Sequence, residues 1–162
     1  MPATLVVLRG NSGSGKTTVA RLLQDRFGLV VVSQDVLRRE VLGVSDGLGS
    51  PAVDLIAQTA RFALDRGFSV VVEGILRSDI YAPMLAALAA EHRGHTHFFR
   101  FDLSFDETVR RHRTKDGTDF GEPELRRWWR GDDALPECDE RVIGSEHTPQ
   151  DVVGLIAATA GW

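Results

Sequence analysis

Hydrophobic residues follow two alternating patterns along the chain. Short, continuous apolar runs rich in β-branched residues, such as TLVVL and SVVV, predict strands that are buried on both faces. Between these runs, apolar residues recur at helical spacing, as Val19, Leu22, Leu23 and Phe27 do. Strands are expected at Thr4–Leu8, Leu29–Val32, Ser69–Val72, Thr96–Phe101 and, with a weaker pattern, Glu140–Ile143.

Capping residues and helix breakers mark the ends of the expected helices. Gly28 ends the first helix, proline follows the cap at Ser50, and SFDE at Ser104 predicts a capping box. Helices are expected from Lys16 to Gly28, at Asp35–Leu42, Pro51–Arg66, Asp79–His92, Ser104–Thr114 and Glu122–Arg130, and after the TPQD cap at Thr148. Strands that alternate with helices predict an α/β fold with a parallel sheet covered on both faces.

Composition and charge favour one globular domain over residues 1–162. Hydrophobic residues make up 43% of the chain and charged residues 26%, and the net charge of -4 does not favour a chain-wide grip on nucleic acid. The single cysteine, Cys138, excludes an internal disulfide and fits a reducing cytoplasm. No apolar run approaches the ~20 residues of a membrane span. We therefore expect a soluble cytoplasmic protein with no membrane partner, and the sequence carries no signal of its oligomeric state.

One segment matches a phosphate-binding motif without a mismatch. GNSGSGKT, Gly10–Thr17, follows an expected strand, opens an expected helix and fits G-x-x-x-x-G-K-[ST]. Glycines let successive N–H groups surround a phosphate, and the helix N-terminus adds its positive dipole end. Lys16 can reach the β- and γ-phosphates of ATP or another nucleoside triphosphate, and the Thr17 hydroxyl can hold Mg²⁺. The predicted nucleotide-binding residues here are Gly10, Asn11, Ser12, Gly13, Ser14, Gly15, Lys16, Thr17 and Thr18.

With this motif the chain resembles the P-loop NTPases, and its small size resembles their nucleoside-monophosphate-kinase-like branch. The resemblance covers the whole chain. It implies a three-layer sandwich, with a five-stranded parallel sheet flanked by helices and a small helical lid at about residues 113–128. GTPases similar to Ras carry an N-K-x-D motif, which this sequence lacks. Motor-type ATPases show a strand that ends in a carboxylate pair and an oligomer-bridging arginine, and neither is evident here.

Asp35 follows the second expected strand, at the sheet edge where open α/β folds bind ligands. A carboxylate there can orient or deprotonate a substrate hydroxyl as it attacks the γ-phosphorus. Arg38 shares a helix face with Asp35 and can bind an anionic group of the acceptor or steady the carboxylate. The alternative for Asp35 is a helix cap. Arg39 is expected to point elsewhere, as a solvated charge.

The D-x-x-R arrangement of Asp35 and Arg38 resembles that of polynucleotide kinases. Chloramphenicol phosphotransferases and zeta-toxin-type sugar-nucleotide kinases also have an aspartate after the second strand, so the resemblance implies that Asp35 is the base and Arg38 an acceptor contact. It also places substrate-contacting or Walker-B-like carboxylates near Glu73, in VVVEG. Glu73 or Asp35 would then contact Mg²⁺ through water, or Glu73 the substrate, with a turn carboxylate as the alternative. Arg77 is a further candidate acceptor contact.

A basic cluster follows the fourth expected strand. Residues Asp106–Arg130 hold seven of the chain's nineteen lysines and arginines. Cations in a phosphoryl-transfer site offset the charge of the transferring group. Small P-loop kinases have a lid at this point, and the resemblance assigns Arg111 and Lys115 to the phosphates or the base, with Arg113 as their substitute. The alternative is a solvated basic helix face.

These features together predict an ATP-dependent kinase that phosphorylates a hydroxyl of a small molecule, such as an antibiotic, a nucleoside or a sugar nucleotide. The expected catalytic residues are Lys16, Asp35, Arg111 and Lys115. One alternative is a 5′-hydroxyl polynucleotide kinase, which the Asp35 and Arg38 pair favours and the acidic net charge does not. Another is a nucleotide-switched binding protein, in which hydrolysis drives a conformational change.

Overall fold

The sheet has the parallel arrangement that the apolar runs predict. The computed structural model describes residues 2–162 and, within them, places five parallel strands in the order β2-β3-β1-β4-β5. The strands are β1 (Leu5–Arg9), β2 (Val30–Ser33), β3 (Val70–Gly74), β4 (Thr96–Phe101) and β5 (Glu140–Ile143). Because β1 is central, the loop that follows it emerges in the middle of the sheet's carboxyl edge.

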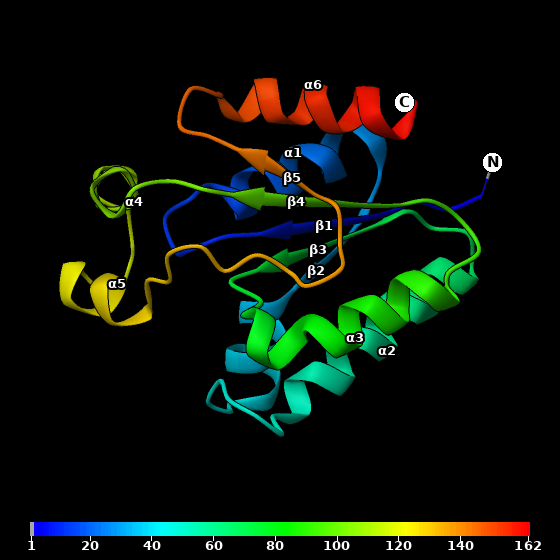
Figure 1. The fold of residues 1–162 in the computed structure, drawn as a ribbon, viewed down its shortest axis with the longest axis horizontal. Coiled ribbons are helices and arrows are strands. Elements are labelled where there is room, and N and C mark those ends of the chain that lie inside the picture. Colours follow the sequence, from blue (N-terminus) through cyan, green and yellow to red (C-terminus); the bar gives the residue numbers. More distant parts are fainter. Residues whose placement is uncertain (1) are drawn as a thin grey trace.

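Helices cover both faces of this sheet and complete three layers. They are α1 (Lys16–Phe27), η1 (Val36–Leu42), α2 (Pro51–Asp65), α3 (Ser78–Glu91), α4 (Phe105–His112), α5 (Glu122–Trp128) and α6 (Pro149–Ala160). Helices α1 and α6 lie on one face and α2 and α3 on the other, while α4 and α5 stand beyond the carboxyl edge (Figure 1). No helix within residues 2–162 is long and apolar enough to cross a membrane.

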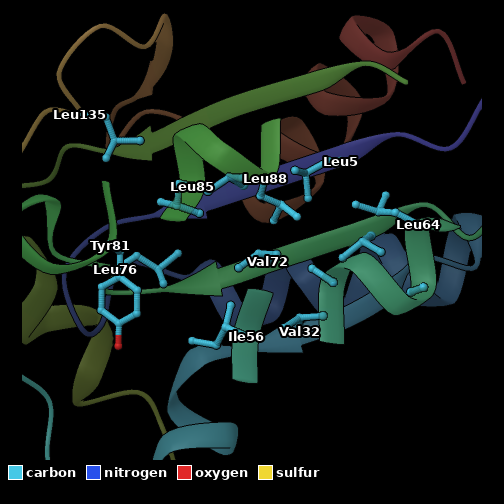
Figure 2. Close-up of a cluster of buried hydrophobic side chains, with 14 of the residues drawn as sticks. Leu5, Val32, Ile56, Leu64, Val72, Leu76, Tyr81, Leu85, Leu88 and Leu135 are labelled. Carbon is cyan, nitrogen blue, oxygen red and sulfur yellow. The ribbon is translucent and has the colours of Figure 1, made fainter. Parts of the chain in front are cut away.

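The alternation of side chains along β1 builds two separate cores. Leu5 and Val7 pack with α2 and α3 in the cluster drawn in Figure 2, whereas Val6 and Leu8 pack with α1 and α6. All five residues of β1 are buried. Each fully buried valine or leucine contributes about 1.5–3 kcal/mol, so the strand that carries the phosphate-binding motif is firmly fixed.

The short helix expected at Asp35–Leu42 is present, as a π-helix at Val36–Leu42 with no buried residue. One other local prediction differs from the structure. The box at Ser104 is only half formed. The Ser104 hydroxyl accepts from the Glu107 N–H at 3.2 Å, but the Glu107 carboxylate accepts from Arg110 and Arg111 instead of from the Ser104 amide. Charge-assisted hydrogen bonds from two guanidinium groups outcompete one neutral amide.

Candidate active site

The P-loop, residues 10–17, wraps around the side chain of its own lysine. The Lys16 Nζ donates to the Asn11 carbonyl at 2.8 Å and to the Ser14 hydroxyl at 3.2 Å. Gly13 has φ +82°, and a Cβ there would lie 2.7 Å from the Thr108 carbonyl oxygen. Glycine is therefore required at this position both for the left-handed backbone and for the close approach of α4.

Three charged groups from other segments act on Lys16. Its pKa is lowered to about 8, mainly by burial; the negative charges of Glu73 and Asp35 oppose this shift, and the positive charge of Lys115 adds to it. The pKa of Lys115 is also below its ordinary value, because burial lowers it by more than the negative charge of Glu73 raises it. The fold thus brings the P-loop, the ends of β2 and β3, and residue 115 to one place, as expected of a phosphoryl-transfer site.

The end of β3 presents a buried carboxylate to the P-loop threonine. The Thr17 Oγ1 lies 3.4 Å from both Glu73 carboxylate oxygens. Glu73 is 3% exposed, and within residues 2–162 it has no ion-pair partner inside 4.0 Å. A hydroxyl and a buried carboxylate are hard oxygen donors, so this pair fits Mg²⁺.

Asp35 does not cap the helix that it precedes. Its backbone is helical, with φ -65° and ψ -43°, and its side chain accepts no capping hydrogen bond. Instead its Oδ1 lies 3.2 Å from the Arg38 Nη2, and its Oδ2 lies 3.7 Å from the Arg39 Nη1. The expectation that Arg39 points elsewhere is therefore wrong, because residues three and four positions along a helix both return to the same face. The Asp35 side chain is 56% exposed and open to a ligand.

Arg77 lies at the start of α3 and forms a two-point contact with Asp79. Its Nε is 3.1 Å from Oδ1 and its Nη2 is 2.6 Å from Oδ2. These hydrogen bonds raise the pKa of Arg77 and lower that of Asp79. The Nε and Nη2 groups of Arg77 are thus already paired with a carboxylate of the chain itself, that of Asp79.

The two arginines expected to contact nucleotide are placed differently. The Arg111 Nη1 donates to the Ser14 carbonyl of the P-loop at 2.8 Å, and its Nη2 lies 3.4 Å from the Ser145 carbonyl. The Arg113 side chain is 72% exposed and pairs with Glu122 at 3.3 Å. The structure therefore brings Arg111 to the P-loop and does not bring Arg113 there.

A cavity of about 400 Å³ adjoins the P-loop. Its walls include Gly13, Gly15 and Thr18, the end of α4 with Arg111, and residues 145–149 before α6. A volume of this size accommodates a small-molecule ligand. Its position beside the phosphate-binding loop suits the nucleoside part of a nucleotide.

Sequence reasoning missed a buried arginine that precedes the P-loop. Arg9 is 1% exposed, and its guanidinium donates to the Leu76 carbonyl at 3.1 Å, to Glu140 at 2.5 Å and to the Asp133 carbonyl at 2.8 Å. These partners join β1 to three distant segments. The one local signal is a charged residue directly after the apolar run TLVVL, where the expected strand stops one residue short.

A comparison with protein families matches most of the chain. A family model described as an AAA domain, AAA_33, matches residues 5–129. The chain belongs to this family. The matched residues include the P-loop, Asp35, Glu73 and Lys115. No curated protein matches the chain.

Solved structures confirm the P-loop kinase fold. The APS kinase CysC of Mycobacterium tuberculosis, solved with AMPPNP and APS, is 17% identical with a TM-score of 0.74, over 99% of each chain. A sugar kinase from Janibacter is 18% identical with a TM-score of 0.73, over 97% of this chain and 94% of the other. A gluconokinase from Sinorhizobium meliloti is 18% identical with a TM-score of 0.70, over 99% and 94%. At these identities the likeness establishes the fold alone.

Proposed function

We propose that the protein is an ATP-dependent kinase that transfers the γ-phosphoryl group to a hydroxyl of a small molecule. The observation that carries this proposal is the contact of the P-loop with the end of β3, where the Thr17 Oγ1 lies 3.4 Å from the buried Glu73 carboxylate, next to the end of β2 that Asp35 follows. Phosphoryl transfer needs a loop that binds the nucleotide phosphates, a carboxylate that binds Mg²⁺, a carboxylate that orients the alcohol and a second cation.

The P-loop and the adjoining cavity would bind ATP. Backbone N–H groups of residues 10–17 and the Lys16 ammonium would hold the β- and γ-phosphates, and the nucleoside would enter the cavity lined by residues 145–149. Arg111, already 2.8 Å from the Ser14 carbonyl, would add charge beside the phosphates. The structure of the M. tuberculosis APS kinase with the nucleotide AMPPNP supports this arrangement by analogy of fold.

Thr17 and Glu73 would hold Mg²⁺ directly or through water. Their oxygens lie 3.4 Å apart, and the buried Glu73 carboxylate has no ion-pair partner in the described part of the chain. When bound, Mg²⁺ neutralises charge on the β- and γ-phosphate oxygens. The negative charge of Glu73 also opposes the effect of burial, which lowers the pKa of Lys16.

Asp35 would orient the acceptor hydroxyl and receive its proton. The ion pair with Arg38 at 3.2 Å fixes the direction of the carboxylate while leaving it accessible. As the acceptor oxygen bonds to the γ-phosphorus, the bond from that phosphorus to the β–γ bridging oxygen breaks and ADP leaves. Lys115 and Arg111 would stabilise the charge that spreads over the transferring oxygens.

An acceptor screen tests this function. Purified protein is incubated with Mg²⁺, ATP and pools of hydroxylated small molecules, ADP release is followed, and each product is identified by the mass of one added phosphoryl group. We expect at least one acceptor to stimulate ADP release. A nucleotide-switched binding protein would instead hydrolyse ATP slowly with no stimulation by any acceptor, and that result would contradict the proposal.

A further inference from the structure

The tyrosine near the start of α3 joins two segments that are distant from it in the chain. The Tyr81 ring is fully buried in the core cluster, and Figure 2 shows its hydroxyl directed away from the other labelled side chains. That hydroxyl accepts from the Gln34 Nε2 at 3.1 Å and donates to the Asp46 Oδ1 at 2.9 Å. These two partners stand on either side of η1 in the sequence, so one hydroxyl holds both flanks of this helix.

The direction of the two hydrogen bonds follows from the chemistry of the groups. A carboxylate only accepts, so the Tyr81 hydroxyl uses its proton on Asp46 and its lone pair on Gln34. Burial raises the pKa of this hydroxyl above its usual value, so the hydroxyl keeps its proton at neutral pH. Gln34 therefore presents its amide nitrogen to Tyr81, and all three side chains are held in one orientation.

Apolar burial does little to fix η1 itself. None of its seven residues is buried, and of these only Leu37 packs, partly buried, against the core cluster. A polar contact holds its end instead, where the Arg38 Nη1 donates to the Val44 carbonyl at 3.1 Å, two residues before Asp46. A segment with few buried apolar contacts opens locally at low cost, so its hydrogen bonds to the core decide how well it is held.

Gln34 connects the proposed base to the end of β3. It directly precedes Asp35 and is 2% exposed. Gly74, which follows Glu73, approaches so closely that an added Cβ would lie 2.7 Å from the Gln34 Cβ. A displacement of Gln34 would therefore move Asp35 relative to Glu73.

We propose that the Tyr81 hydroxyl is a positioning group for phosphoryl transfer, which holds residues 34–46 on α3 and, through Gln34, fixes Asp35 relative to Glu73. This inference rests on the proposed kinase function and adds to it a residue that acts only through others. A carboxylate that prepares an alcohol must stay aligned with the phosphorus, and a misplacement of about 1 Å costs on the order of a hundredfold in rate. The alternative is that the hydroxyl only satisfies buried polar groups, in which case its loss would lower stability alone.

Tyr81→Phe tests the hydroxyl, because it keeps the ring in the core. With saturating MgATP and an acceptor from the screen, the single-turnover rate of transfer should fall by about tenfold to a hundredfold, while the Kd for ATP changes by less than about twofold. Hydrogen exchange should become faster in residues 34–46. The matched control is Ser69→Ala, which removes a hydroxyl that accepts from the Thr4 N–H at 3.0 Å at the amino ends of β3 and β1. It should leave the transfer rate and the exchange of residues 34–46 unchanged.

A double-mutant cycle tests whether the effect passes through Gln34. Gln34→Met removes the amide at similar side-chain length and should slow transfer about as much as Tyr81→Phe. The two changes together should slow it by no more than about twofold beyond either alone, because contacts in one hydrogen-bonded chain are not additive. Asp46→Asn keeps an oxygen that accepts from Tyr81 and should transfer within about threefold of the wild-type rate, whereas Asp46→Leu should be as slow as Tyr81→Phe.

Transfer by Tyr81→Phe at the rate of Ser69→Ala would overturn the inference, whether or not exchange in residues 34–46 changes, and would leave the kinase function standing. Equal losses of ATP affinity and transfer rate would overturn it too, since they would assign Tyr81 to stability alone. Losses that multiply in the cycle would show that Tyr81 does not act through Gln34. A wild-type protein that phosphorylates no acceptor would contradict the kinase function itself, and this inference with it.

Discussion

The side-chain amide of Asn11 holds the backbone of Arg130 with two hydrogen bonds. The Asn11 Nδ2 donates to the Arg130 carbonyl and the Arg130 N–H donates to the Asn11 Oδ1, both at 2.8 Å. The backbone carbonyl of the same Asn11 accepts from Lys16. One P-loop residue therefore contacts both the phosphate-binding lysine and the segment that follows α5.

Removal of the Asn11 side-chain amide is expected to break both hydrogen bonds to Arg130 and so to loosen the loop whose backbone carbonyl holds Lys16. Asn11→Ala leaves the N–H and the carbonyl of Arg130 without their partner and should lower the free energy of unfolding by about 1–3 kcal/mol. Urea denaturation measures this loss, and isothermal titration measures the accompanying fall in ATP affinity. Asn11→Asp keeps the acceptor but not the donor, so its stability should fall between wild type and Asn11→Ala. Unchanged stability in Asn11→Ala would show that the contact contributes nothing.

The buried Arg9 should contribute strongly to stability. Arg9→Met removes the ion pairs of Arg9 with Asp133 and with Glu140, whose side chain is 4% exposed. Glu140 then keeps only the longer contact with Arg100 at 3.5 Å, and Asp133 only that with Arg130 at 4.0 Å. A buried carboxylate that loses its nearest cation is costly, so the free energy of unfolding should fall by about 3–5 kcal/mol. Arg61→Met, which removes an exposed partner of Glu91, serves as the control and should cost less than about 1 kcal/mol. Equal denaturation midpoints for the two variants would contradict this role for Arg9.

Alanine substitutions at Gly13 and Gly49 distinguish the cost of a strained backbone from the cost of a steric clash. Both have positive φ, +82° and +76°, but an added Cβ meets the Thr108 carbonyl oxygen at 2.7 Å only at Gly13, while Gly49 has nothing within 4 Å. Gly49→Ala should therefore cost only the left-handed strain of about 1–2 kcal/mol and preserve ATP binding. Gly13→Ala should cost more and abolish ATP binding, because α4 or the P-loop must shift. Thermal unfolding with and without ATP measures both effects, and ATP binding by Gly13→Ala would refute the argument.

The protein should take up a proton at Lys16 when it binds ATP in mildly alkaline solution. Burial lowers the pKa of Lys16 to about 8, so above that pH most free protein carries a neutral Lys16. A bound triphosphate favours the ammonium form and raises this pKa, so affinity should fall as pH rises above about 8, by up to tenfold per pH unit. Titration calorimetry in buffers of different ionisation enthalpy measures the uptake.

Lys115 requires a control in that experiment, because burial lowers its pKa too. Lys115→Arg keeps a permanent charge at that position, so proton uptake by this variant is assigned to Lys16. Equal ATP affinity on both sides of pH 8, with no uptake in either protein, would contradict the placement of Lys16 against the phosphates.

Local sequence signals were sufficient to predict the strands, the helices and the P-loop. The apolar runs, the proline and serine caps and G-x-x-x-x-G-K-[ST] each act within a few residues, and the structure has strands and helices where they predict them. The parallel sheet then brings the residues after β1, β2 and β3 to one edge. For that reason Lys16, Asp35 and Glu73 could be grouped before any coordinates were known.

Contacts between distant segments had no such signal. Arg9 meets Asp133 and Glu140 across more than a hundred residues of chain, and nothing near Arg9 specifies those partners. The basic cluster could not be resolved into individual roles, because Arg111 and Arg113 have the same chemistry and differ only in the direction that α4 gives them. The position of Arg39 was predicted wrongly for a different reason: its guanidinium lies close to the Asp35 carboxylate, four residues earlier, instead of facing solvent alone.

Single-turnover phosphoryl transfer by Asp35→Asn is the most direct test of the proposed mechanism. With saturating MgATP labelled in the γ-phosphate and an acceptor from the screen, the rate should fall by about 10²–10⁴-fold, while ATP affinity stays near the wild-type value. Asp119→Asn removes the other carboxylate partner of Arg39, 3.5 Å away, and should transfer phosphate at close to the wild-type rate. Transfer by Asp35→Asn at the rate of Asp119→Asn would contradict the assignment of Asp35 as the group that prepares the acceptor hydroxyl.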